Sequence, residues 1–186
     1  FRSGMGWNQL NVFVWTPLAA FVLQLVFIPV LAAAVTLLLF DKYLGTHFFD
    51  PAAGGDVLLY QNLFWFYSHP AVYIMIVPGF GVISEVIACF ARKRIFGYSF
   101  VAFSSLAIAV LGFIVWGHHM FTTGQSIYAG MVFSFLTFLI AVPTAVKIFN
   151  WTATLYRGSV SMDSPMLYAF GFMGLFLIGG LTGLFL

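Results

Sequence analysis

Charged side chains are scarce in this sequence. Its 186 residues include seven Lys or Arg and five Asp or Glu, which makes 6% charged residues against 62% hydrophobic ones. An average soluble domain carries roughly 25% charged residues, so these charges are too few to cover a soluble surface. The net charge of +2 is also too small to indicate a nucleic-acid partner. We therefore expect membrane lipid to surround most of the chain.

Cysteine is nearly absent, and an initiating methionine is missing. The one cysteine, Cys89, excludes an internal disulfide. The chain begins at Phe1, and no basic segment or small-residue cleavage site of a secretory signal precedes the first apolar run. It ends at Leu186 inside another apolar run. We therefore expect a fragment of a longer protein.

Long apolar runs, by contrast, are abundant. A run of about 20 residues predicts a membrane-spanning helix, because that length crosses the hydrocarbon core of a bilayer. Five such helices are predicted, at residues 12–40, 57–90, 100–117, 127–155 and 166–186. The predicted fold class is an all-α polytopic membrane protein, in which residues 1–186 form a single membrane domain.

The few charges between the spans alternate in sign. Basic residues mark the cytoplasmic side of a membrane protein. They lie before the first span, between the second and third, and between the fourth and fifth: Arg2, Arg92, Lys93, Arg94 and Arg157. The connection between the first and second spans carries three aspartates and one lysine instead: Asp41, Asp50, Asp56 and Lys42. The first span is therefore predicted to run outward from the cytoplasm.

The second span contains a histidine followed directly by proline, at His69 and Pro70. Proline has no N–H and frees a carbonyl one turn back, so the helix can bend beside the imidazole. Tyr73 is four residues after His69 and shares its helix face. A bend of this kind suits a site that admits a metal or a small ligand. A buried histidine bonded to a neighbouring helix is the alternative interpretation.

The third span ends in two adjacent histidines, His118 and His119. Neighbouring residues on an α-helix point about 100° apart, so both can reach one metal only where the helix ends or distorts. Taken alone, they could also be a pair of interfacial histidines. Together with His69 they place three imidazoles in the outer half of the membrane. Three neutral imidazoles suit copper or zinc and leave a coordination position open for chemistry.

Polar residues also lie in the inner half of the spans. Lys147 and Thr144 lie on the fourth span, and Ser84 lies about three turns inward of Tyr73 on the second. These groups could line a polar route toward Tyr73. A lysine in this position could instead extend its ammonium group to the cytoplasmic surface. Glu85 could pair with the basic residues that follow the second span.

Five stretches of this sequence resemble subunit I of the haem-copper terminal oxidases. They are "FFDPAAGGD", "LLYQNLFWFYSHPAVYIMIVPGFGVISEV", "GFIVWGHHMFTTG", "AVPTAVKIFNW" and "GGLTGLFL", and together they extend the resemblance over essentially the whole chain. The resemblance implies about five membrane helices of a twelve-helix subunit. It also implies an active-site copper that faces a high-spin haem, with a low-spin haem nearby. The ligands of both haems are expected on helices outside this chain.

The resemblance assigns roles to individual residues. The three copper ligands are His69, His118 and His119. Tyr73 matches the tyrosine that is joined covalently to the first of these ligands and supplies a proton and an electron. The lysine-named proton pathway is matched by Lys147, Thr144 and Ser84. Two residues match the surroundings of the copper: Trp65 as a neighbouring aromatic and Val72 at the oxygen entrance.

Two departures from the common pattern of the family favour a bacterial source. Ala71 occupies the position of a glutamate that ends a second proton channel, and it is preceded by Tyr67 and Ser68. This resembles the bacterial subgroup in which a tyrosine hydroxyl replaces the carboxylate. The second departure follows the third span, where three residues replace acidic and polar residues of the mitochondrial proteins: Gln125, Ser126 and Tyr128.

The resemblance implies a proton-translocating enzyme of the bacterial inner membrane that reduces O2 to water. Its expected partners are oxidase subunits II and III, cytochrome c as electron donor, and membrane lipid. A quinol oxidase remains an alternative, because the donor site lies elsewhere. Nitric-oxide reductases lack the tyrosine four residues after the first histidine, so Tyr73 argues against them. A membrane transporter, the non-enzymatic alternative, often shows inverted repeats, and we find none.

Overall fold

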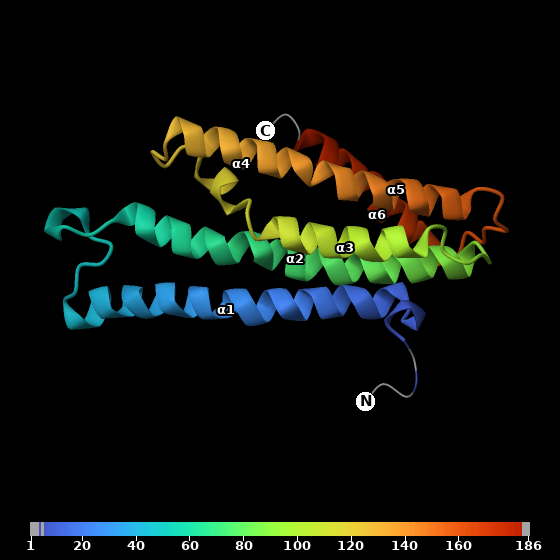
Figure 1. Ribbon diagram of the computed structural model, residues 1–186, viewed down its shortest axis with the longest axis horizontal. Helices are drawn as coiled ribbons and strands as arrows, with labels where there is room; N and C mark the ends of the chain where they lie inside the picture. The colour runs from blue at the N-terminus through green and yellow to red at the C-terminus, as the bar shows by residue number, and fades with distance from the viewer. Residues whose placement is uncertain (1–3, 5, 184–186) are drawn as a thin grey trace.

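The computed structural model describes residue 4 and residues 6–183, and every regular element within them is helical (Figure 1). The long helices are α1 (Val12–Leu44), α2 (Val57–Phe90), α3 (Tyr98–Gly112), α4 (Ile127–Leu139), α5 (Ala141–Leu155) and α6 (Ser164–Thr182). Three short 3-10 turns lie between or before them: η1 (Trp7–Gln9), η2 (Pro51–Ala53) and η3 (Trp116–Met120). The predicted all-α class is confirmed.

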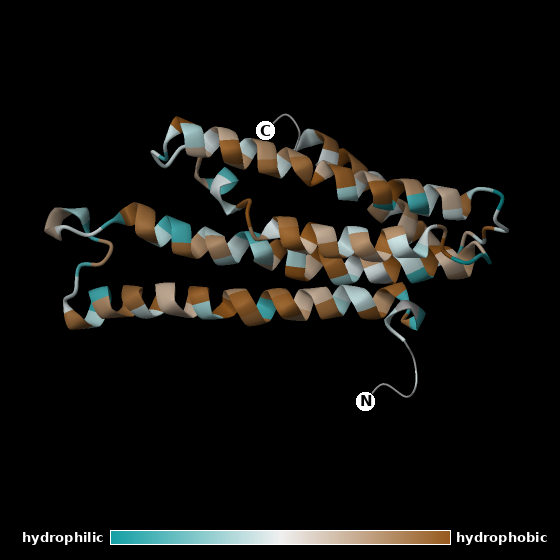
Figure 2. Ribbon diagram, viewed as in Figure 1, coloured by the Kyte–Doolittle hydropathy of each residue, from teal (hydrophilic) through white to brown (hydrophobic). Residues whose placement is uncertain are grey.

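Four helical stretches are long and apolar enough to cross a membrane. They are α1, α2, α6 and the run from Ile127 to Leu155 that α4 and α5 form together, while α3 is a shorter apolar helix. Apolar residues cover the helices along their length, and polar residues gather in the connections (Figure 2). Many large apolar side chains are exposed, as expected for surfaces that face lipid or further membrane helices. The chain is an integral membrane protein.

Helix α2 lies at the centre of the bundle. It packs along α1 and also contacts α3, α5 and α6, while α3 packs between α1 and α5 (Figure 1). The buried core therefore draws side chains from five helices. Its largest fully buried apolar members come from the same five helices, α1, α2, α3, α5 and α6: Phe27, Leu23, Phe80, Ile87, Ile108, Trp151 and Met166.

The connection between α1 and α2 is held by aspartates. Asp41 accepts hydrogen bonds from the Thr46 hydroxyl at 2.6 Å and from the backbone N–H groups of Phe48 and Phe49 at 2.8 and 2.9 Å. Asp56 caps the start of α2 by accepting from the Leu58 N–H at 2.7 Å. Asp41, in the last turn of α1, and Asp56, at the end of the loop, therefore set where α1 ends and where α2 begins.

Two of the predicted spans are interrupted. The third was expected to run to residue 117, but α3 ends at Gly112 and the two histidines lie in the separate turn η3. The fourth breaks at Ile140, where α4 ends and α5 begins. Pro143 explains this break, because it has no N–H to bond the carbonyl four residues earlier, at Leu139. Arg2 and the last residues of the fifth predicted span, 184–186, lie outside the described residues.

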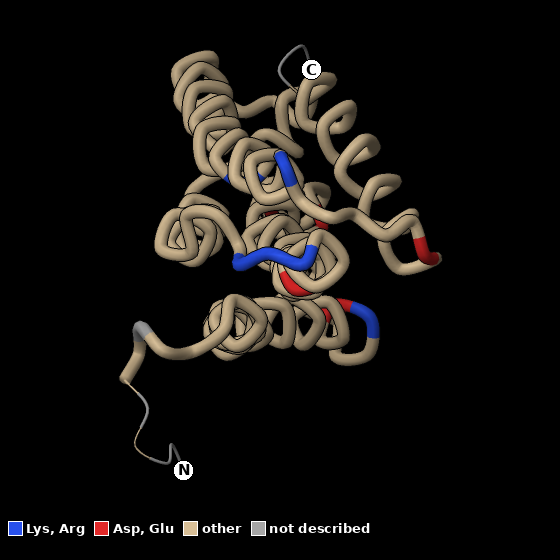
Figure 3. Tube along the Cα trace, turned by 90° about the vertical axis from the view of Figure 1, so that its right-hand side faces the viewer, with Lys and Arg blue, Asp and Glu red and all other residues tan. Residues whose placement is uncertain are grey.

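The basic loops lie together at one end of the bundle. Figure 3 looks onto this end, where the connections between α2 and α3 and between α5 and α6 both carry Lys or Arg. Lys93 donates to the Tyr156 carbonyl at 2.7 Å and so joins the two connections. The connection between α1 and α2, with its aspartates, lies at the opposite end (Figure 1). The predicted separation of basic and acidic loops is therefore present in the fold.

Candidate metal centre

Three imidazoles from two elements meet in the half of the bundle away from the basic loops. His69 Nδ1, on α2, lies 3.1 Å from His119 Nε2, and His118 Nε2 lies 3.0 Å from the same atom. One nitrogen from each ring lies within 4.8 Å of the others. His69 is buried, and the other two rings are half-buried. Three ring nitrogens at such separations need a shared proton or a shared cation between them.

The turn η3 allows two adjacent histidines to face one point. A regular α-helix would point them about 100° apart. Here α3 has already ended, and His118 and His119 lie in a 3-10 turn. Gly117 lets this turn approach α4, because a Cβ at that position would lie 2.2 Å from the ring of Phe133. Gln125 donates to the Gly117 carbonyl at 3.1 Å and stabilises the turn.

The orientation of His118 is set from α4. Its Nδ1 lies 2.8 Å from the hydroxyl oxygen of Thr137, and that hydroxyl donates its own proton to the Phe133 carbonyl at 2.6 Å. The hydroxyl can therefore only accept from the imidazole, which makes Nδ1 the protonated nitrogen. The lone pair of His118 Nε2 is left facing the other two rings. This is the tautomer that a metal bound at Nε2 requires.

His69 presents its two ring nitrogens to different surroundings. Its Nδ1 faces the other histidines, whereas its Nε2 is buried and has no hydrogen-bond partner among the described residues. The ring of Tyr73 lies beside it, with ring centroids 4.5 Å apart. Gly112 makes room for that tyrosine, because a Cβ there would lie 2.7 Å from Tyr73 Cδ2. An orphaned buried nitrogen is costly, so this atom is a candidate for further chemistry.

Aromatic rings form one wall of the cluster. Trp65 stacks on His119, with ring centroids 3.9 Å apart and ring planes within 7° of each other. Its indole N–H donates to Gln61 at 3.1 Å, which keeps the ring in place. The structure therefore brings Trp65 to the cluster, whereas the side chain of Val72 is 47% exposed in this chain.

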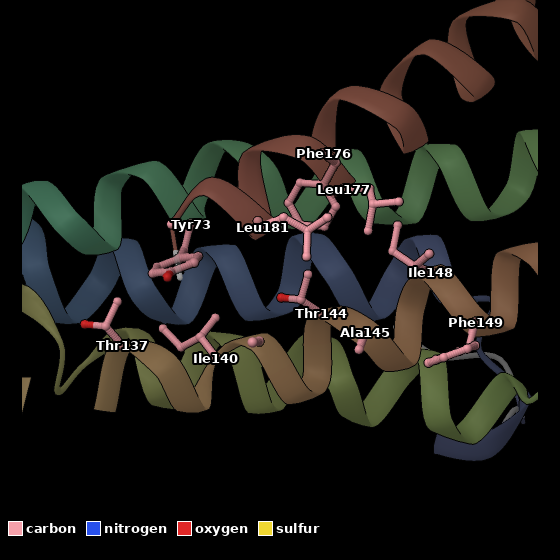
Figure 4. Close-up of a pocket in the computed structure, with 13 residues that line it drawn as sticks. Tyr73, Thr137, Ile140, Thr144, Ala145, Ile148, Phe149, Phe176, Leu177 and Leu181 are labelled. Carbon is pink, nitrogen blue, oxygen red and sulfur yellow. The ribbon is translucent and has the colours of Figure 1, made fainter. Parts of the chain in front are cut away.

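A cavity of about 370 Å³ lies beside Tyr73 and Thr137. It is lined mostly by apolar side chains of α5 and α6, and Thr144 also faces it (Figure 4). Tyr73 and Thr144 thus share one space, although they come from different helices. The cavity lies next to the histidine cluster through Thr137, which bonds His118.

The polar residues of the predicted proton route are bound to different helices. The Ser84 hydroxyl donates to the Phe80 carbonyl at 2.6 Å and accepts from the indole N–H of Trp151 at 2.9 Å. Lys147 is fully buried and bonded to α3. The alternative in which its ammonium reaches the cytoplasmic surface is therefore wrong for this structure. Glu85 is exposed, and the pairing with Arg92 or Lys93 is not among the ion pairs of the described residues.

Sequence comparison points to one family. The family described as "Cytochrome C and Quinol oxidase polypeptide I" matches residues 2–186. The chain belongs to this family. As an oxidase polypeptide I, it is related to proteins named cytochrome c oxidase subunit 1. The identity is 56% with the protein of Thermostichus vulcanus, 58% with that of Synechocystis sp. and 49% with that of Cereibacter sphaeroides.

These alignments cover 96%, 96% and 98% of this chain but 32% of each relative. The chain therefore spans about a third of the length of the curated relatives that it matches. The three relatives are bacterial proteins, in agreement with the expected location in a bacterial inner membrane. Membership in the oxidase polypeptide I family also implies haem and copper in general terms.

Sequence reasoning missed several residues that complete the site of this oxidase polypeptide. Thr137 orients His118, Trp151 bonds Ser84, and Ser105 bonds Lys147. These pairs are 19, 67 and 42 positions apart, so no local spacing pattern connects them. Gln125 was noted as a departure from the family pattern. Its bond to the histidine turn gives that departure a structural role.

Proposed function

We propose that this chain forms part of the catalytic subunit of a terminal respiratory oxidase that reduces O2 to water. Cytochrome c is the proposed electron donor, and oxidase subunits II and III are the proposed partners. The observation that carries the proposal is the cluster of three imidazoles beside a half-buried tyrosine. The names of the relatives support this function.

The donor set of the cluster fits copper. Copper accepts imidazole nitrogen readily, and a three-histidine site leaves room for a small ligand. His69 would hold the metal through Nδ1, and His118 and His119 would hold it through Nε2. When bound, the copper would supply a redox centre at which O2 meets electrons. The chain itself fixes the three ligands from α2 and η3 and sets the tautomer of His118.

Tyr73 is proposed as the hydrogen and electron source for O2 cleavage. Its ring packs against the ring of His69, whose Nε2 has no hydrogen-bond partner among the described residues. This arrangement supports the covalent link between the two side chains that the family resemblance implies. A haem edge fits the apolar cavity that Tyr73 and Thr144 share, because an apolar macrocycle needs apolar walls.

Two proton routes are proposed. Ser84, Lys147 and Thr144 would serve the route toward Tyr73, and Thr144 already shares a cavity with that tyrosine. Tyr67 and Ser68 would serve the second route, in place of the glutamate that is absent at Ala71. Both side chains are half-buried on α2. A quinol donor remains the alternative to cytochrome c, because the family description names both classes of oxidase.

Copper analysis of the intact oxidase tests the central proposal. His69→Ala should remove the copper of this site, because it deletes one of three ligands. The copper-to-protein ratio is measured by elemental analysis and compared with that of the parent. His47→Ala is the matched control, since His47 lies in the loop between α1 and α2 and pairs with Asp50. Equal copper in the His69 variant and the parent would refute the assignment.

A further inference from the structure

Lys147 is held by α3, although it projects from α5. Its Nζ donates to the Val101 carbonyl at 3.1 Å and to Ser105 Oγ at 2.5 Å. The ring of Phe80 lies 4.8 Å from the same nitrogen and covers it from α2. The lysine side chain is 0% exposed. Within the described residues, two oxygens of α3 therefore satisfy the ammonium group.

The proton of the Ser105 hydroxyl is already committed. It goes to the Val101 carbonyl at 2.9 Å, so the hydroxyl oxygen faces Lys147 only as an acceptor. Ser104 also donates to this carbonyl, at 3.0 Å, and it is likewise buried. Ser104 has no bond to the lysine among the described residues. Both serine hydroxyls thus donate to the same carbonyl, but only Ser105 also accepts a hydrogen bond from Lys147.

A buried ammonium that lacks acceptors is strongly disfavoured. Hydrogen bonds to a charged group are also among the strongest side-chain bonds in proteins. Ser105 supplies one of two oxygen acceptors, and its bond is the shorter of the two. Its removal would leave a protonated Lys147 with the Val101 carbonyl alone.

We propose that Ser105 is a positioning residue for the proton-delivering lysine. Its hydroxyl holds the amino group of Lys147 in one place, between the cytoplasmic end of the bundle and the cavity of Tyr73 and Thr144. This inference rests on the proposed role of Lys147 in proton delivery. It adds a residue of α3 to a route otherwise assigned to α2 and α5.

The test uses the intact oxidase and follows anaerobic reduction of the high-spin haem by stopped-flow absorbance. Ser105→Ala should slow this step about ten-fold, because the lysine loses a charge-assisted hydrogen bond. Ser105→Thr keeps the hydroxyl and should restore much of the rate. Ser104→Ala is the matched control and should reduce at the parental rate. Ser105→Cys fills nearly the same space with a weak acceptor, so its reduction should also be slow. This variant replaces Ser105→Ala if the alanine variant does not assemble.

A double variant separates positioning from structural damage. In a Lys147→Met background, the change Ser105→Ala should have no further effect on the reduction rate, because the group that it acts on is gone. An additional loss there would identify a structural defect and overturn the inference.

Two further outcomes separate a failure of this inference from a failure of the proposed proton route. Parental reduction in Ser105→Ala, together with stalled reduction in Lys147→Met, would refute the role of Ser105 and leave the proposed function intact. Parental reduction in Lys147→Met would refute the proton route itself, and the inference would fall with it.

Discussion

Tyr67 lies on α2 one turn before Ala71, where the common form of the family has a glutamate. Its side chain is half-buried and packs against the core of the bundle. A phenol hydroxyl can both donate and accept a hydrogen bond, so it suits a relay between water molecules. Packing against a haem edge is the alternative role.

We predict that Tyr67→Phe slows turnover and proton uptake by at least about a hundred-fold, the usual worth of a positioned proton-transfer group. Copper and haem content should stay unchanged. The double change Tyr67→Phe with Ala71→Glu should restore part of the activity. Oxygen-pulse measurements of proton release from reconstituted vesicles check both. A single variant that pumps at the parental rate and ratio would assign Tyr67 to packing.

Thr137 is the residue that sets the tautomer of His118. Thr137→Val keeps the shape of the side chain and removes the oxygen that accepts from Nδ1. Changes behind a metal ligand typically cost about ten- to a hundred-fold in metal affinity, so the variant should lose copper to a chelator more readily. Copper retention after dialysis measures this.

Thr152→Val is the control for that experiment. The hydroxyl of Thr152 bonds a carbonyl of its own helix at 2.8 Å, as the hydroxyl of Thr137 does at 2.6 Å, but no histidine contact accompanies it. Equal copper retention in the two variants would show that the bond between Thr137 and His118 does not matter for the metal.

At the scale of elements, one glycine lets the end of α3 pack closely against Tyr73 of α2. Gly112 is the last residue of α3, and a Cβ there would lie 2.7 Å from the ring of Tyr73. Gly112→Ala should therefore displace the tyrosine and cost about 1–3 kcal/mol through overpacking. We expect oxygen consumption to fall while the variant still assembles.

Oxygen consumption and thermal unfolding of the purified oxidase check this prediction. Gly130→Ala serves as the control, because a Cβ at Gly130 meets only ordinary contacts, the nearest at 3.9 Å. Full activity in Gly112→Ala would mean that Tyr73 has another position open to it.

The break between α4 and α5 also belongs to this scale. The mostly apolar character of residues 127–155 predicts one helix. Pro143 removes the bond to the Leu139 carbonyl, and the helix divides at Ile140. Thr137 lies on one side of the break and Lys147 on the other. The proline signal was visible in the sequence, but its effect on the direction of the two pieces was not.

The whole molecule has a basic end and an acidic end, which predicts its orientation in the membrane. Single cysteines, introduced after Cys89→Ser, test it. Ala53→Cys lies in the connection between α1 and α2, and Arg94→Cys lies in the connection between α2 and α3; both parent side chains are exposed. An impermeant thiol reagent should label the first variant in right-side-out spheroplasts and the second in inside-out vesicles. The reverse pattern would invert the topology.

The sequence by itself determined the membrane environment, the helical class and the family. The environment and the class follow from composition and from the lengths of apolar runs, because lipid accepts only segments that satisfy their own backbone groups. The family follows from the stretches of sequence that resemble the oxidases. It also supplied His69, His118 and His119 as candidate ligands, since few polar residues lie at that depth.

Only the tertiary structure decided how these residues meet. The turn η3 faces two adjacent histidines toward α2, Thr137 selects a tautomer, and Ser105 binds Lys147. Each of these contacts depends on where a helix ends and on how it is rotated against its neighbours. That rotation is set by packing between residues far apart in the chain, such as Gly112 against Tyr73, so no local pattern could have specified it.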